Sequence, residues 1–164
     1  MAKKGKSAAE RLARSPTHLL HRALQLALDF HTEAVGTEGL TQRQFAVLAA
    51  AEGAEGVSQS KLARATGIDR STLAELVARL IAKGLLERER SADDARANAV
   101  RLTEAGAALL AETAKPARRA DRHLLAILGA KRRDAFVKDL AALAAAAAQP
   151  PKKEKRKQGK AKPD

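Results

Sequence analysis

Apolar residues recur at three- and four-residue spacings along most of the chain, which is the pattern of helices that bury one face. The pattern predicts a first helix from Pro16 to about Glu33, with the proline suited to the first turn. Glycines then interrupt the pattern, and Thr41 is placed to cap a second helix that stops by Gly53.

A short helix and a longer helix follow, separated by a tight turn. Ser58 is placed to cap the short helix over residues 59–65, and the turn at 66–69 leads into a helix that Gly84 ends. The apolar residues of the longer helix form one stripe, made of Leu73, Leu76, Val77, Leu80 and Ile81. The opposite face carries small and hydrogen-bonding side chains and is predicted to stay outside the core.

The pattern then changes to that of a hairpin. Residues 86–90 and 99–102 read as two short strands, the second with alternating burial, joined by the polar segment 91–98. Helical spacing returns over 103–128, where Pro116 predicts either a kink or a break. A last, alanine-rich helix is predicted from about Lys131 to Ala148.

Two helices joined by a tight turn, with a hairpin directly after the second, have the order of a winged helix-turn-helix. The fold class is therefore mainly α with a small β-hairpin wing. The second helix is predicted to enter the major groove of DNA, where its outer face and first turn supply the contacts; these candidates are Arg70, Ser71, Thr72, Glu75 and Arg79. Glu75 repels phosphate, so it either reads a cytosine amino group or pairs with an arginine.

Composition excludes several other classes of protein. The chain has no cysteine, which excludes disulfides and thiolate metal sites, and no apolar run long enough for a membrane span. It shows no nucleophile paired with histidine and an acid and no glycine-rich phosphate loop, so we expect neither an enzyme nor a cofactor. His18 and His21 lack a third ligand with sound spacing, so no metal site is expected. A cytoplasmic location is the default expectation.

The net charge of +12 is unevenly distributed. Residues 1–14 carry +4 and residues 152–164 carry +5, which leaves +3 for residues 15–151. Both ends are poor in apolar residues and are predicted to be disordered tails, which either keep the protein soluble or attract DNA phosphates without regard to sequence. An alternative function is therefore a non-specific architectural DNA-binding protein that uses these tails.

Several motifs in register resemble the MarR family of transcriptional regulators. They are Asp94-Ala95-Arg96 followed by Val100-Arg101-Leu102-Thr103-Glu104-Ala105-Gly106, the segment 40–48, Leu62-Ala63, the segment 67–73 and the segment 80–86. The resemblance spans about residues 16–148. It implies a homodimeric regulator, more often a repressor, that binds a pseudo-palindromic operator. It also implies that the wing arginine, Arg96, enters the minor groove and that Asp94 braces it.

The resemblance also implies a division of the chain. Between the basic tails 1–14 and 150–164, it gives an N-terminal dimerisation helix at 15–40, a winged domain at 41–103 and C-terminal dimerisation helices at 104–149. Members of the family respond to small ligands, often aromatic acids or their coenzyme A thioesters. Candidate residues for such a ligand are His21, Gln25, Phe30, Arg43, Arg118, Arg119 and Arg122, each of which also fits a packing or solvent-exposed role.

Overall fold

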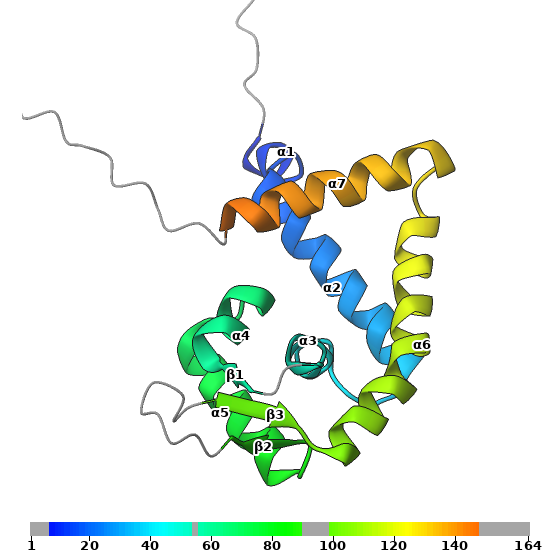
Figure 1. The fold of residues 1–164 in the computed structure, drawn as a ribbon. Coiled ribbons are helices and arrows are strands. Elements are labelled where there is room, and N and C mark those ends of the chain that lie inside the picture. Colours follow the sequence, from blue (N-terminus) through cyan, green and yellow to red (C-terminus); the bar gives the residue numbers. More distant parts are fainter. Residues whose placement is uncertain (1–6, 54–55, 90–98, 148–164) are drawn as a thin grey trace, which may run out of the picture.

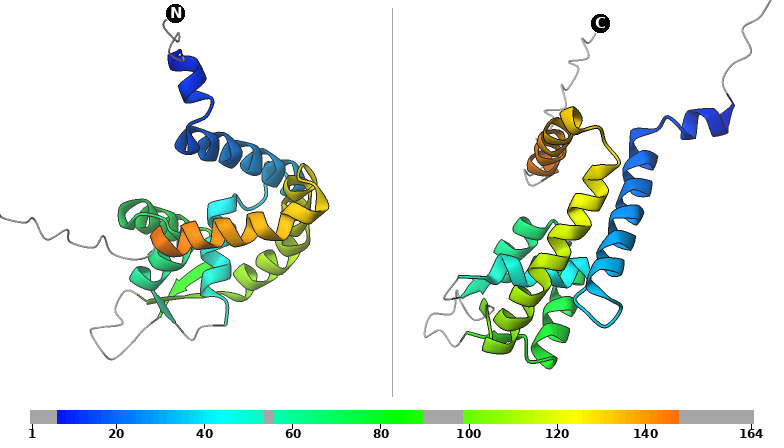
Figure 2. Two further views of the ribbon diagram at one scale, coloured as in Figure 1. Left: turned by 90° about the horizontal axis from the view of Figure 1, so that it is seen from above. Right: turned by 90° about the vertical axis from the view of Figure 1, so that its right-hand side faces the viewer.

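Seven helices and three short strands make up the computed structural model, which describes residues 7–53, 56–89 and 99–147 (Figure 1). In chain order they are α1 (Ala8–Leu12), α2 (Pro16–Val35), α3 (Gln42–Ala51), β1 (Val57–Ser58), α4 (Gln59–Thr66), α5 (Arg70–Ala82), β2 (Leu86–Arg88), β3 (Ala99–Leu102), α6 (Glu104–Ala126) and α7 (Ala130–Ala147). The elements from α3 to β3 form the winged region. Helices α2 and α6 run side by side away from it, and α7 crosses above it (Figures 1 and 2).

The predicted helix starts are confirmed by the capping contacts. Thr41 Oγ1 accepts a hydrogen bond from the Gln44 backbone N–H at 3.3 Å, and Gln44 Oε1 accepts from the Thr41 N–H at 2.9 Å. Ser58 Oγ accepts from the Lys61 N–H at 3.3 Å, at the start of α4. Each pair satisfies donors that the first turn of a helix would otherwise leave without a partner.

The N-terminal tail is shorter than predicted. Residues 8–12 lie inside the segment 1–14 that was expected to be disordered, yet they form the helix α1. The physical reason is a capping box, in which Ser7 Oγ accepts from the Glu10 N–H and Glu10 Oε2 accepts from the Ser7 N–H. This short polar signal was overlooked among the basic residues.

The sheet has one strand more than the predicted hairpin. Val57 and Ser58 pair with Val100 and Ala99, so β3 lies between β1 and β2 in an antiparallel sheet. As the central strand, β3 buries both Ala99 and Val100. The alternation predicted for residues 99–102 is therefore lost at the start of the strand.

Helix α6 continues through Pro116, so the predicted alternative of a break at this residue is wrong. The buried face of α6 extends across the proline, through Leu110 and Thr113 before it and Ala117 and Ala120 after it. Packing of α6 along α2 therefore holds both halves in one helix, and the ribbon of α6 bends part-way along (Figure 1).

The hydrophobic core lies in the winged region. Its fully buried side chains include Leu48 of α3, Leu62 of α4, Leu73 and Leu80 of α5, and Val100 of β3. The predicted stripe of α5 is confirmed, with Ile81 packed at the edge of this core. Outside the winged region burial is uneven. Helix α6 buries one face, whereas α2 buries only His31 and α7 buries none of its residues.

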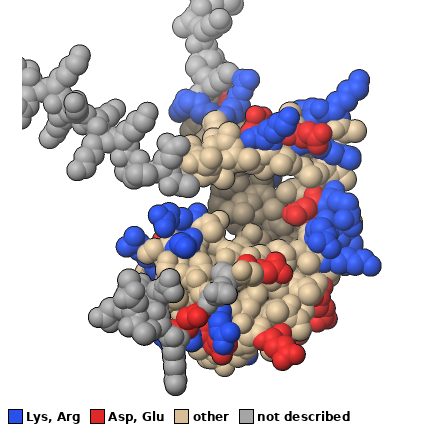
Figure 3. All heavy atoms as spheres, in the orientation of Figure 1, with Lys and Arg blue, Asp and Glu red and all other residues tan. Residues whose placement is uncertain are grey.

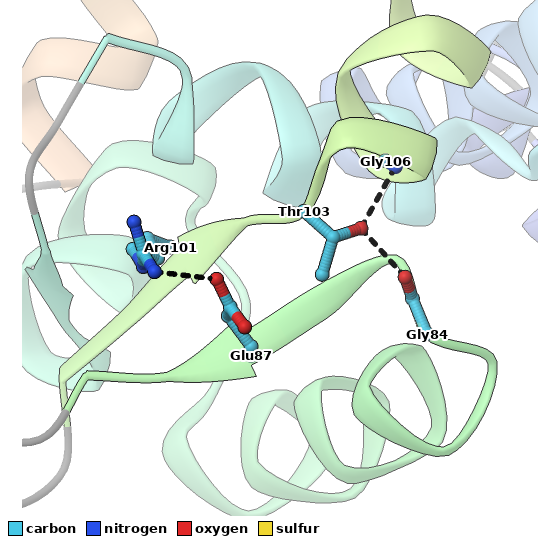
Figure 4. A network of polar contacts seen from close by, with 5 residues as sticks. All are labelled: Gly84, Glu87, Arg101, Thr103 and Gly106. Atoms are coloured by element: carbon cyan, nitrogen blue, oxygen red, sulfur yellow. Dashed lines mark hydrogen bonds and ion pairs between the residues drawn. The ribbon is translucent and has the colours of Figure 1, made fainter.

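One polar junction joins α5, the sheet and α6 (Figure 4). The Thr103 hydroxyl donates to the Gly84 carbonyl at 2.6 Å and accepts from the Gly106 N–H at 3.0 Å, which caps α6. The Thr103 N–H also donates to the Leu85 carbonyl at 3.2 Å. Gly106 packs so closely on the Leu85 backbone that a Cβ at this position would collide with the Leu85 carbonyl.

We predict that Gly106→Ala destabilises the protein although alanine has the higher helix propensity. Intrinsic propensity alone would stabilise α6 by about 1 kcal/mol, whereas the collision with the Leu85 backbone is expected to cost about 1–3 kcal/mol net. Denaturant unfolding of the wild type and of Gly106→Ala measures the difference in their free energies of unfolding. Gly129→Ala is the matched control because a Cβ there meets nothing within 4 Å, and equal stability of the two variants would contradict the prediction.

Candidate nucleic-acid interface

Helices α4 and α5 are joined by a turn that only the backbone of a glycine adopts easily. Gly67 ends α4 with φ +70°, in the left-handed region, and its N–H donates to the Ala63 carbonyl at 2.9 Å. After the turn, α5 packs against α4, and the apolar stripe of α5 is buried. The outer face of α5 is exposed at Ser71, Glu75 and Arg79, as the sequence predicted, while Thr72 is half-buried.

Asp69, which the sequence analysis did not select, caps α5. Its Oδ1 accepts from the Thr72 N–H at 2.9 Å and from the Ser71 hydroxyl at 2.7 Å. The Thr72 N–H and the Ser71 proton are therefore engaged within the protein. The signal for this cap in the sequence is an aspartate directly before the helix, a residue type that often accepts from the backbone N–H three positions later.

The charge on Asp69 determines whether the Ser71 hydroxyl donates or accepts the hydrogen bond between them. The hydrogen bond from the Thr72 N–H, and next that from the Ser71 hydroxyl, hold the pKa of Asp69 well below its usual range. An ionised carboxylate only accepts hydrogen bonds, so Ser71 must be the donor. The Ser71 oxygen then offers its remaining lone pairs to another donor.

Cationic side chains flank this surface. Lys61 and Arg64 of α4 and Arg70 and Arg79 of α5 are exposed, and Figure 3 shows Lys and Arg atoms gathered over α4. Within the described ranges, Glu75 has neither a hydrogen bond nor an ion pair. Of the two roles predicted for Glu75, pairing with an arginine therefore finds no partner in the described part of the chain.

The strands of the wing are described but its tip is not. Arg101 Nη2 of β3 pairs with Glu87 Oε1 of β2 at 2.8 Å, which adds a charged contact across the hairpin (Figure 4). Asp94 and Arg96, the predicted minor-groove pair, lie outside the described residues.

Two of the predicted ligand residues lie where α2 packs on α6. The Phe30 ring meets the His123 ring edge to face with centroids 6.1 Å apart, and Arg119 Nη2 donates to the Ala34 carbonyl at 2.9 Å, near the end of α2. The other members of the set on α2 and α6 are exposed: His21, Gln25, Arg118 and Arg122.

Two cavities border the turn between α4 and α5. Arg43 lines the smaller one, of about 220 Å³, together with Gln42, Ala46 and residues 66–69. The larger one, of about 470 Å³, lies between residues 60–70 and the end of α7, at Ala144 and Ala147. None of the predicted ligand residues on α2 or α6 lines either cavity.

A buried histidine of α2 contacts the segment that leads into α3 and α3 itself. His31 Nε2 bonds the Leu40 carbonyl at 2.9 Å, and its ring lies 6.2 Å from that of Phe45. Among the described residues, no group of three His, Asp or Glu side chains is arranged to hold a metal ion. No helix of the described ranges is both long and apolar enough to cross a membrane.

Comparison with known proteins places this geometry in a family. The sequence profile of the MarR family matches residues 38–97, which run from the start of the winged region into the hairpin. The transcriptional regulator HosA of Escherichia coli O157:H7 is 36% identical over 98 residues, which are 60% of this chain and 73% of HosA.

Solved structures extend the similarity to the helices outside the winged region. BpsR of Bordetella bronchiseptica, described as regulated in DNA binding by 6-hydroxynicotinic acid, is 30% identical with a TM-score of 0.74 over 80% of this chain and 94% of BpsR. The transcriptional repressor CouR, bound to a 23-mer DNA duplex, is 30% identical with a TM-score of 0.73 over 85% of this chain and 99% of CouR. CouR has also been solved bound to p-coumaroyl-CoA.

The predicted fold class, mainly α with a small β wing, is confirmed. The chain belongs to the MarR family of transcriptional regulators.

Proposed function

We propose that the protein is a homodimeric repressor that binds a pseudo-palindromic operator and is released by a small anionic ligand. The observation that carries this proposal is the exposed polar face of α5, held on a buried apolar stripe and followed directly by the hairpin. This is the arrangement that presents a recognition helix to the major groove. Two such helices, one from each subunit, would contact half-sites about 10 bp apart.

Unburied apolar side chains support the dimer. Several large ones on α1, α2, the end of α6 and α7 are exposed in the single chain: Leu12, Leu19, Leu20, Leu24, Leu26, Ile127, Val137, Leu140 and Leu143. Exposed apolar surface of this extent is typical of a subunit interface. A second copy that covers these helices would supply the burial that α2 and α7 lack.

The wing is proposed to contact the minor groove through Arg96, with Asp94 as its brace. The residue between them is Ala95, which brings no charge to a phosphate, so the basic residues at the chain ends are proposed to add attraction to DNA. A narrow, A/T-rich groove strengthens the arginine contact because it focuses negative potential.

The proposed effector class follows from two relatives. BpsR is regulated by 6-hydroxynicotinic acid and CouR binds p-coumaroyl-CoA, and both ligands are anions with a flat ring. An anion lowers operator affinity if it binds more tightly to a conformation whose two recognition helices do not match the spacing of the half-sites.

We predict that the protein binds its own upstream intergenic DNA in preference to a scrambled duplex at near-physiological salt. Electrophoretic mobility shift with both duplexes measures the preference, and Arg96→Ala should weaken the specific complex while leaving the fold and the dimer intact. Equal, salt-sensitive binding to both duplexes would contradict the proposal and favour the architectural function.

We predict that Leu24→Glu converts the dimer to a monomer. Leu24 is 52% exposed in the middle of α2, so a carboxylate there leaves the fold of the single chain intact but is buried without a partner in the interface. Light scattering after size-exclusion chromatography gives the mass. Leu24→Met is the control that keeps the apolar surface, and a Leu24→Glu protein that stays dimeric would disprove this interface.

We predict that Ser71 reads an amino group, on adenine or cytosine, because its own proton is committed to Asp69. Ser71→Ala should weaken operator binding about fivefold, the value of one hydrogen bond, and only when that base carries its amino group. Fluorescence anisotropy with duplexes that contain purine in place of single adenines, or 2-pyrimidinone in place of single cytosines, measures the coupling.

Thr37→Ala, at an exposed hydroxyl between α2 and α3, is the control for this experiment. A loss for Ser71→Ala that is the same on operator and scrambled duplex would show a phosphate contact instead of base reading.

A further inference from the structure

The outer ridge of α5, made of Ser71, Glu75 and Arg79, has an acidic side chain at its middle. The three residues follow one another at four-residue spacing and are all exposed, so they lie along one line of the helix, about 6 Å apart. The exposed alanines beside them contribute only methyl groups: Ala74, Ala78 and Ala82. Of the exposed side chains between Ser71 and Arg79, Glu75 is therefore the only one that can form a hydrogen bond with a base edge.

The charge of Glu75 is not neutralised by a neighbour in residues 7–53, 56–89 and 99–147. Arg79 lies one turn further along α5, but the two side chains form no ion pair with each other. DNA phosphates line both edges of the major groove, so a carboxylate that α5 carries into the groove is repelled by them. Glu75 therefore weakens binding to DNA in general, unless a base supplies a contact that offsets the repulsion.

A carboxylate only accepts hydrogen bonds, which limits the base edges that it can contact. In the major groove guanine presents the acceptors O6 and N7, and thymine presents O4 and a methyl group, so neither base offers a donor. The amino group of adenine donates, but it lies between two acceptors, its own N7 and the O4 of thymine. The amino group of cytosine has one such neighbour, the O6 of its guanine, so it is the donor that best suits Glu75.

We propose that Glu75 is a specificity filter, which accepts a hydrogen bond from the amino group of one cytosine in each half-site and repels DNA that presents another base there. Because Glu75 lies about 6 Å from Ser71, this cytosine falls within about two base pairs of the base that Ser71 reads. The discrimination comes mostly from weaker binding to wrong sequences, and less from tighter binding to the right one. The role rests on the proposed operator binding, since α5 meets base edges only inside the groove.

Glu75→Gln tests the repulsion, because glutamine has the same shape, keeps an acceptor and carries no charge. Its affinity for random-sequence DNA should rise while its affinity for the operator changes less than threefold, so that the ratio of the two affinities falls about tenfold. Fluorescence anisotropy at near-physiological salt measures both affinities, and higher salt should narrow the gain on random DNA. Glu38→Gln removes the same charge from an exposed position between α2 and α3, and this control should leave the ratio unchanged.

Selection of bound duplexes from a randomised library identifies the base without knowledge of the operator. The wild type should enrich cytosine at one position of each half-site, and Glu75→Ala should lose this preference while it keeps the others. On the selected duplex, 2-pyrimidinone in place of that cytosine removes only the amino group. This replacement should weaken binding of the wild type about tenfold and binding of Glu75→Ala less than twofold.

Three results would overturn the proposal: an equal gain of Glu75→Gln on operator and random DNA, a library from which the wild type enriches no cytosine, or the same cytosine preference in the wild type and in Glu75→Ala. The first result would leave Glu75 as a source of general repulsion, and the last would assign the cytosine to another residue. A wild type that does not prefer its own upstream DNA would count against the proposed function alone, because the library decides the filter without that DNA.

Discussion

The Thr103 hydroxyl is the contact on which the geometry of the winged region depends. It bonds the end of α5 through Gly84 and the start of α6 through Gly106, and it directly follows the central strand β3. Helix α5, the hairpin and the long helix α6 thus meet at this one side chain. A displacement of α6 relative to its neighbours therefore acts on α5 and on the hairpin at the same point.

The distribution of burial divides the molecule into two parts with different sources of stability. The winged region has a closed core of leucine and valine side chains, so its fold is determined within one chain. Helix α2 contacts α6 along one side and presents leucines on the other, and α7 buries nothing. This division suits a regulator whose DNA-binding unit is rigid and whose spacing between units depends on the less buried helices.

Features formed by residues that are close in the sequence were the easiest to predict. The caps at Thr41 and Ser58, the turn at Gly67 and the stripe of α5 each follow from residues within one or two turns of one another. Strand β1 was missed because two residues carry no periodicity, and its partner in β3 lies more than 40 positions away. Asp69 directly precedes α5 and caps it, so this contact too lies within reach of prediction from neighbouring residues.

Features built from distant segments were beyond sequence reasoning. The larger cavity combines residues 60–70 with Ala144 and Ala147, and nothing in the pattern of either segment signals the other. Of the seven predicted ligand residues, Arg43 alone lines one of the two cavities at the turn between α4 and α5. Continuity of α6 through Pro116 likewise depends on α2, whose contact outweighs the local cost of the proline.

Because α7 has no buried residues, the rate at which its amide hydrogens exchange should depend on protein concentration. A helix that packs so little in its own subunit opens at almost no free-energy cost when the subunit is alone, so its amides exchange rapidly. Association would supply the missing protection, and the folded fraction of α7 would then rise with protein concentration by mass action. When few copies of the protein are present, the fraction of subunits with a folded α7 would therefore follow the fraction that has dimerised.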